Sequence, residues 1–549
     1  MRNFIKKQKN DETDLFQLYQ DGIDYKTRIG YFTRADLHWA MYNDDQWRGI
    51  KSADLPKVQI NIVRQNIDYK IASIMSQNIA INYSPMNVSD EIEGDNDAEI
   101  EKNSMAKAYT MMLTDVVKQK WETLKMEKLI RSALLNGVVT GDMVLFTYWD
   151  GKTETGSYEK GDFKTIVLDG ANVFFQNPNS SDAESQEWIL LTGRESVSLL
   201  KKEATDKGMP KDEVDKISSD DDTEYQAGEY GKIEMNHSGT DGKATFFIKL
   251  MRSDDGSIMY TKKTRCATIC EEINMGVKKY PLNYGNWQTI KNSMHGLDEA
   301  RGTIPNQIAI NQMHSLVVLW MRNNAFGKVA IDSSRIKGYT NSVTNIIEVD
   351  GDLTGAIQQL APGQFNQAII NYAELLTQAT KSARGASDAA LGNINPTNTS
   401  AIAVTIKQAA IPLQTVQANL YQLVEDWSLT VAEFIMAKYN NRVVMAKSDT
   451  GLTAVKYEKP PSNLMLGVRV DVGPSSYFSE MAGQSTLDNL LVQNRITMVQ
   501  YLERMKKFNL IPDVEGLIED EQKKEEMLKQ QQEMMTQQQM TMQQPPQMV

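Results

Sequence analysis

The stretch from Ser400 to Tyr439 reads SAIAVTIKQAAIPLQTVQANLYQLVEDWSLTVAEFIMAKY, and it decides how the chain is built. Its apolar residues recur with helical spacing. We therefore predict one helix over 400–440, about 60 Å long at about 1.5 Å per residue. Pro412 lies inside this stretch and has no backbone N–H, so we expect a kink there. Helices of this length are rare unless they pack against a large assembly.

The segments before this helix alternate between helix and sheet. We predict a helix over 291–324, a small α/β module over 325–363 and a second helix over 364–385. The strands of the module are expected at 329–331 and 346–349. Residues 386–399 are rich in Gly, Asn, Ser and Ala and predict a loop. The order is therefore helix, small module, helix, loop, long kinked helix.

The flanking segments predict an α+β fold. Residues 1–290 combine helical patterns, at 11–54 and 105–137 with Gly137 as C-cap, with strand patterns. The first strands are expected at 143–149 and 163–168, with Val173 to Pro178 continuing their sheet. Residues 441–475 return to strands. Residues 476–549 predict helices that run into a tail whose last 29 residues hold 10 Gln and 6 Met.

Composition limits the classes of function. The 549 residues are 41% hydrophobic and 24% charged, which is ordinary for a folded chain and excludes a mostly disordered or collagen-like protein. The net charge of −12 argues against bulk electrostatic binding of nucleic acid, although a channel could let DNA pass. Two cysteines, Cys266 and Cys270, are too few for a disulfide framework, and we expect both to be small buried apolar groups. No apolar run reaches the roughly 20 residues of a membrane span.

Catalytic and metal-binding patterns are not found in the sequence. The four histidines (His38, His237, His295 and His314) are scattered without ligand spacing. Gly151-Lys152-Thr153 imitates the end of a phosphate-binding loop, but Phe146 stands where that loop needs a glycine. The flanking residues predict strand, turn and strand, with no helix N-terminus to hold a phosphate. We therefore expect no enzyme activity, no cofactor and no metal.

The order of segments resembles that of the portal proteins of tailed bacteriophages. The motifs that carry the resemblance lie in family order between about residues 40 and 440. They are Tyr42-Asn43-Asp44-Asp45-Gln46-Trp47, the 56–85 stretch with Asn61, Asn66, Tyr69 and Lys70, Leu134-Leu135-Asn136-Gly137, Val173 to Pro178, Tyr280-Pro281-Leu282, Gln307 to Asn311, Gly385 to Gly392 and Thr399 to Ala403. The chain departs from the family pattern at Asn177, where the family has an acidic residue.

The resemblance implies a ring, usually of twelve subunits, at one vertex of the virion capsid, assembled in the host bacterial cytoplasm. Such a ring is the channel for double-stranded DNA during packaging and ejection. Its implied partners are the large terminase, the major capsid protein or scaffold, and tail adaptor proteins, with no membrane. By this mapping, residues 1–290 and 441–475 form the wing and 476–549 the helical crown. Residues 291–324 and 364–385 form the two stem helices, 325–363 the clip and 386–399 the tunnel loop.

The predicted tunnel loop contains no Lys or Arg between Ser387 and Ser400, which suits a wall along which DNA slides. The candidate DNA-channel residues are Lys381, Arg384, Gly392, Asn393, Asn395, Thr397 and Lys407. Lys381 and Arg384 are equally well explained as cations that favour a helix C-terminus, and Lys407 as part of an ion pair between subunits. The loop itself could be a plain connector between helices.

The candidate partner-docking residues in the clip are Lys328, Arg335 and Lys337. Their mixture with acidic neighbours suits a rim that exchanges partners, and equally any solvated loop. Two other functions compete with a portal. One is another structural subunit of the virion, such as a head-tail adaptor or minor head protein. The other is a nucleotide-driven motor, which the missing phosphate-binding loop disfavours.

Overall fold

The computed structural model describes residues 15–48, 55–76, 78–86, 97–155, 159–220, 242–325, 328–336, 349–352, 354–360, 366–384, 413–439, 442–448, 451–457, 459–460, 464–473, 487–493, 495–505 and 517–518. The chain divides into two compact units. The first is Met1–Met75 with Ala80–Asp471, and the second is Ser76–Ile79 with Val472–Val549. The described elements mix helix and sheet, which confirms the α+β prediction at that level.

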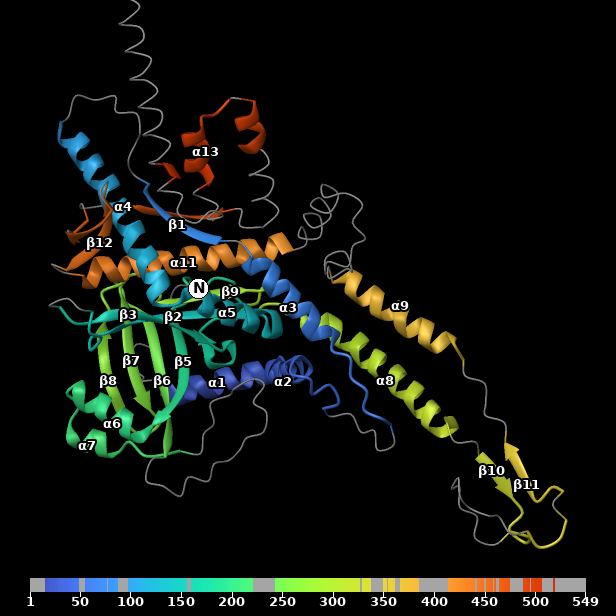
Figure 1. Ribbon diagram of the computed structural model, residues 1–549. Helices are drawn as coiled ribbons and strands as arrows, with labels where there is room; N and C mark the ends of the chain where they lie inside the picture. The colour runs from blue at the N-terminus through green and yellow to red at the C-terminus, as the bar shows by residue number, and fades with distance from the viewer. Residues whose placement is uncertain are drawn as a thin grey trace, which may run out of the picture. The chain divides into compact units, whose positions relative to one another are not determined.

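A three-stranded antiparallel sheet lies at the centre of the first unit, in the order β3 (Asp162–Leu168), β2 (Asp142–Asp150), β9 (Leu282–Asn286). The first six residues of β2 are all buried, because this strand is covered on both faces. Helices α5 (Met126–Thr140) and α11 (Gln414–Lys438) contact this sheet (Figure 1). The indole N–H of Trp427 on α11 donates to Thr165 Oγ1 on β3 at 3.0 Å.

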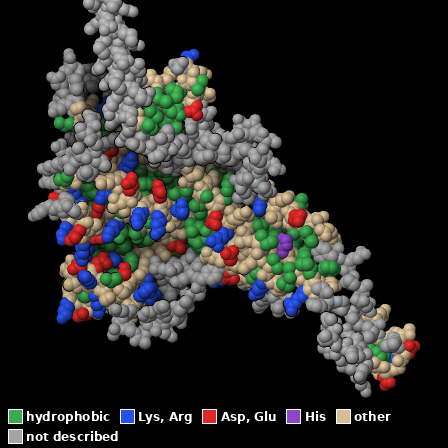
Figure 2. Space-filling model, viewed as in Figure 1, with side chains coloured by type: hydrophobic (Ala, Val, Ile, Leu, Met, Phe, Trp, Pro, Cys, Tyr) green, Lys and Arg blue, Asp and Glu red, His purple; other side chains and the backbone are tan. Residues whose placement is uncertain are grey.

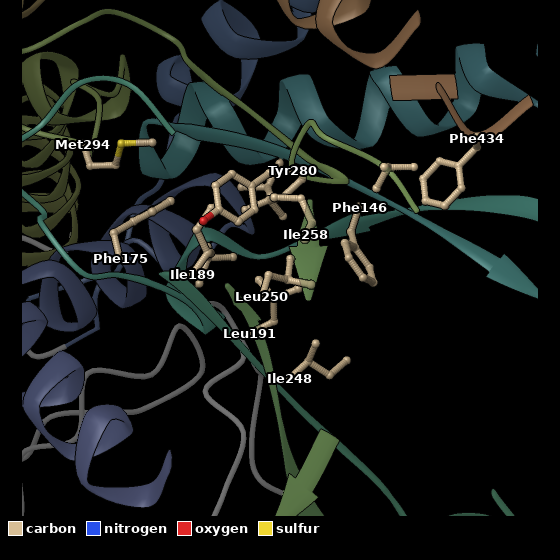
Figure 3. Packing of buried hydrophobic residues seen from close by; sticks show 14 residues of the cluster. Phe146, Phe175, Ile189, Leu191, Ile248, Leu250, Ile258, Tyr280, Met294 and Phe434 are labelled. Carbon is tan, nitrogen blue, oxygen red and sulfur yellow. The ribbon is translucent and has the colours of Figure 1, made fainter. Parts of the chain in front are cut away.

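A second, five-stranded sheet has the order β4 (Val173–Phe175), β5 (Trp188–Ser196), β6 (Lys243–Arg252), β7 (Ile258–Thr264), β8 (Thr268–Asn274). The prediction that 173–178 continues the first sheet is wrong, because β4 pairs with β5. The main apolar core lies between the two sheets and draws on both, with Phe146 from β2, Leu191 from β5 and Phe434 from α11 (Figure 3). Cys270 on β8 is buried as expected, whereas Cys266 precedes the strand and is exposed.

Helices flank the two sheets. Helix α1 (Leu15–Arg28) packs through Leu15 on the five-stranded sheet, and α6 (Val197–Asp206) and α7 (Lys211–Asp215) pack on its end near β8. Helix α1 is followed by α2 (Tyr31–Tyr42), and the single predicted pattern over 11–54 breaks at Gly30, whose φ of 67° only glycine adopts readily. Helix α3 (Ile62–Met75) completes this group.

The predicted helix over 105–137 is two helices. Helix α4 (Asp97–Thr123) ends before Lys125, whose φ is 54°, and α5 begins at Met126. Gly137 is not the C-cap. It lies inside α5, and the cap is Gly141, with a φ of 100°. A side chain at Gly141 would meet the carbonyl oxygen of Gly296 at 2.4 Å, so the turn also needs glycine for space.

A helical pair that we call the arm consists of α8 (Ala300–Ala325) and α9 (Ala368–Ala383). The two helices contact each other along their length and run away from the sheets in Figure 1. Between them in the chain, β10 (Lys328–Ile331) pairs antiparallel with β11 (Ile357–Leu360). Of the second predicted strand, 346–349, only Val349 is described, and it forms a bridge with Ile336; residues 337–348 lie outside the described residues.

After α11 the chain forms the predicted strands. A hairpin joins β12 (Val443–Ser448) to β13 (Gly451–Lys456), and β14 (Leu466–Gly473) pairs with β1 (Asn78–Pro85). In the second unit, α13 (Met498–Met505) buries Leu502 and Met505, and the Tyr501 hydroxyl donates to Asp488 Oδ1 at 2.7 Å. The tail from residue 519 lies outside the described residues.

Candidate functional site at the base of the arm

The predicted site residues fall into two groups. Lys381 and Arg384 lie at the C-terminal end of α9, and Arg335 and Lys328 belong to the β10–β11 module. The remaining predicted residues lie outside the described residues: Lys337, Gly392, Asn393, Asn395, Thr397, Lys407 and Pro412. The described part of the arm is therefore where the predicted site can be examined.

Arg335 has an intramolecular role in the small module. Its Nε lies 3.4 Å from Asp332 Oδ2, and its Nη1 lies 3.5 Å from the carbonyl oxygens of Asp352 and Thr354. Hydrogen bonds from Ser334 and the charge of Arg335 lower the pKa of Asp332 below its usual value. The Arg335 side chain thus links the two halves of the module while about 41% of it is still exposed.

The segment just before α8 carries three buried polar side chains that reach different elements. The first is His295, whose Nδ1 lies 2.7 Å from Asp142 Oδ2 on β2. Asp142 also accepts the hydroxyl of Tyr31 at 3.0 Å and the amide of Gly296 at 2.9 Å. Burial alone would raise the pKa of Asp142, but His295 and the hydrogen bond from the Gly296 amide lower it below its usual value.

Asp298 and Glu299 complete this segment. Asp298 Oδ1 lies 3.0 Å from Nδ1 of His38 on α2, and its Oδ2 lies 4.0 Å from Nε of Arg34. Glu299 Oε1 lies 2.8 Å from Nζ of Lys70 on α3, with the two side chains 6% and 7% exposed. Burial lowers the pKa of Lys70, and the charge of Glu299 opposes that shift. Three buried polar residues within five positions, His295, Asp298 and Glu299, therefore fix the start of α8 to β2, α2 and α3.

Polar residues on α8 also hold the extended segment before α3. The amides of Ile62, Ile60 and Val58 donate to Gln307 Oε1 at 2.8 Å, Asn311 Oδ1 at 3.2 Å and Ser315 Oγ at 3.3 Å. Gln46 Oε1 accepts hydrogen bonds from the side-chain amides of both Gln307 and Asn311. These bonds help to hold the two side chains in the orientation that their contacts with the backbone require.

The spacing of these contacts follows from geometry. Four helical residues rise about 6.0 Å and two extended residues span about 6.6 Å, so every fourth helical residue meets every second amide. A signal for this contact is present in the sequence, because Gln307, Asn311 and Ser315 are polar at i, i+4 and i+8 and therefore share one face of the helix. The partners at 58–62 carry no comparable signal, since the contacts use their backbone.

Arg384 joins the same base from α9. Its Nη1 lies 3.9 Å from Glu299 Oε1, and its guanidinium lies directly over Gly302 on α8. Lys381 lies in the last turn of α9, where a cation interacts favourably with the helix dipole. The structure thus brings Arg384 together with Glu299 and Lys70.

The outer part of the arm, residues 316–325 and 368–375, has the opposite character. No residue of α8 from Leu316 to Asn324 is buried, although 316–321 reads LVVLWM. The most exposed apolar side chains are Leu316 at 48%, Met321 at 49%, Tyr372 at 56% and Leu375 at 62%. Hydrophobic side chains gather on this part of the surface in Figure 2. Contiguous exposed apolar surface of this kind is typical of protein contact sites.

A buried lysine near the five-stranded sheet is a separate feature. Lys26 on α1 donates to the carbonyl oxygens of Gly170, Ala171 and Val173 at 2.6, 2.8 and 2.7 Å, and burial lowers its pKa to about 7. A cavity of about 190 Å³ adjoins it, lined largely by α1 and β4. An ammonium group has three donors, so Lys26 has none left for a ligand and serves to fix β4 against α1.

In comparisons with known proteins, no family model matches the chain and no curated protein matches it significantly. Among the described residues, no group of three or more His, Cys, Asp or Glu side chains is placed to hold a metal ion. No described helix is both long and apolar enough to cross a membrane. Gly151-Lys152-Thr153 lies in the turn between β2 and β3, as the strand, turn and strand pattern predicts.

Proposed function

We propose that this chain is the ring-forming subunit of a phage portal, which forms the channel for double-stranded DNA at one capsid vertex and docks the terminase and then the tail. The observation that carries the proposal is the arm. Two antiparallel helices with a small β module between them precede a long helix, α11, that packs across the central sheet. This is the order that the resemblance implies for stem, clip and long helix.

The surface of the arm supports assembly with further copies of the chain. Only Ala373 and Thr380 are buried among the 16 residues of α9, so most of its apolar residues are not covered within one chain. In a ring, the neighbouring subunit would cover Tyr372 and Leu375 on α9 together with Leu316 and Met321 on α8. Burying such side chains is worth about 1.5–3 kcal/mol each, which is enough to drive association when several are combined.

Negative-stain electron microscopy of the purified chain tests the proposal. We expect class averages that show rings of about a dozen subunits with a central hole wide enough for duplex DNA, about 20 Å. A closed particle without a hole would contradict the portal proposal and favour a head-tail adaptor. The matched variant is Leu375→Glu, which places a charge on the exposed apolar surface and should abolish the rings.

A phosphate-release assay separates the proposal from a nucleotide-driven motor. We expect no ATP hydrolysis by the purified chain, with or without DNA. Hydrolysis that is stimulated by DNA and persists through repurification would contradict a non-enzymatic portal.

A further inference from the structure

The C-terminal half of α9 has few attachments to the rest of the arm. Thr380 is its one buried residue after Ala373, and the side-chain amide of Asn306 on α8 donates to Thr380 Oγ1 at 3.0 Å. The next attachment is Arg384, the last described residue before 385–412. A helix end with so little buried area unfolds locally at low free-energy cost. Each remaining contact therefore has a strong effect on the position of the C-terminal end of α9.

The Arg384 contact differs from the buried pair beside it. Lys70 Nζ and Arg384 Nη1 both face Glu299 Oε1, at 2.8 and 3.9 Å. The Arg384 distance is within range for an ion pair but too long for a hydrogen bond. About 36% of the Arg384 side chain is exposed, against 7% for Lys70. If Arg384 leaves, Glu299 keeps its nearer cation, so no buried charge is left without a partner.

Gly302 provides the space for this contact. A Cβ built on Gly302 would lie 1.3 Å from Arg384 Nη2, so any other residue there would displace the guanidinium. The displaced atoms are the far end of a flexible side chain, so the backbone of α8 can stay in place. Glycine inside a helix is otherwise unfavourable compared with alanine, and its presence in α8 is explained by the room that Arg384 needs.

We propose that Arg384, Gly302 and Glu299 form a releasable clasp that holds the C-terminal end of α9 against the start of α8. The clasp opens without disrupting the buried Lys70–Glu299 pair. Its functional meaning rests on the proposed portal function, in which α8 and α9 are the two stem helices. The clasp then sets how firmly the end of the second stem helix is held against the start of the first.

Hydrogen exchange measured by mass spectrometry on the full-length chain tests the clasp. Arg384→Gln and Gly302→Ala should each increase amide exchange in residues 376–384 about tenfold, with the thermal midpoint within about 2 °C of wild type. The double variant should exchange no faster than either single variant, because both changes remove the same contact. Lys381→Gln removes a cation from the same helical turn and measures the helix-dipole contribution alone, so it should increase exchange clearly less than Arg384→Gln does.

Two results would overturn the proposal. One is exchange in 376–384 that Arg384→Gln leaves at the wild-type rate. The other is a loss of thermal stability on Arg384→Gln as large as that caused by breaking the Lys70–Glu299 pair, which would make Arg384 a structural ion-pair partner. Each variant is compared with wild type in the same assembly state, so these outcomes are independent of whether rings form.

Discussion

The two parts of the arm are stabilised in different ways. At the base, residues 295–315 meet α2, α3 and β2 through buried ion pairs and hydrogen bonds within one chain. In the outer part, four large apolar side chains are about half exposed or more: Leu316, Met321, Tyr372 and Leu375. The base is therefore held by contacts within a single chain, whereas the outer part exposes apolar side chains of the kind found at interfaces.

This difference indicates how rigidity and assembly are divided along one pair of helices. Buried polar contacts depend strongly on geometry, so they fix the direction in which α8 leaves the sheets. Apolar contacts are less directional, so an exposed apolar surface can pair with a neighbour after the chain has folded. Substitutions at the base should therefore reduce folding stability, and substitutions in the outer part should reduce association.

The largest effect is expected from Lys70→Met. The change leaves the Glu299 carboxylate buried without its nearer cation, and we expect a loss of about 3 kcal/mol in the free energy of unfolding of the first unit. Urea denaturation followed by far-ultraviolet circular dichroism measures it. Lys152→Met, which breaks the exposed pair with Asp206, is the matched control and should leave the midpoint unchanged. If the two variants unfold at the same urea concentration, the buried Lys70–Glu299 pair stabilises the base no more than an exposed ion pair would.

A smaller effect is expected from Asn311→Ala. The Ile60 amide loses its acceptor and the side-chain amides of Gln46 and Gln307 lose a partner, so we expect about 1–3 kcal/mol of destabilisation. Gln312→Ala, one position along and exposed, is the control and should change stability by less than about 0.5 kcal/mol. If both variants unfold at the same urea concentration, the contacts between α8 and the 58–62 segment do not stabilise the arm.

The sequence was sufficient to predict the elements whose periodicity is local. Helix α9 and the strands after α11 lie in the predicted ranges, and α8 begins at Ala300 rather than at 291. Helix α11 occupies 414–438 of the helix predicted over 400–440, and residues 400–412 with the expected kink at Pro412 lie outside the described residues. The breaks at Gly30 and Lys125 were missed, because a single residue with positive φ leaves the periodicity on either side intact. Strand β11 (Ile357–Leu360), which pairs with β10, was not predicted, because this short stretch has only a weak strand pattern.

The candidate site was predictable only in part. Arg384 and Lys381 stand out as cations at a helix end, but Glu299 and Lys70 do not, because the sequence gives no sign that residues so far apart meet. The same limit applies to His38 with Asp298 and to His295 with Asp142, which look like scattered histidines until the fold brings their carboxylates beside them. Pairing between distant charges is decided by topology, and local pattern does not encode it.

The smallest effect on folding, and the largest on assembly, is expected from Leu375→Glu. Leu375 is 62% exposed, so a carboxylate there stays solvated and should change the free energy of unfolding by less than about 0.5 kcal/mol. In an assembled ring the same carboxylate would be buried without a partner, which is strongly unfavourable. Mass photometry should therefore show the variant as a monomer under conditions in which wild type is oligomeric. Gln378→Glu adds the same charge at an exposed polar position of α9 and should leave the oligomer intact, because no apolar surface is interrupted. If both variants assemble like wild type, the outer part of the arm is not the interface, and its exposed leucines and tyrosine need another explanation.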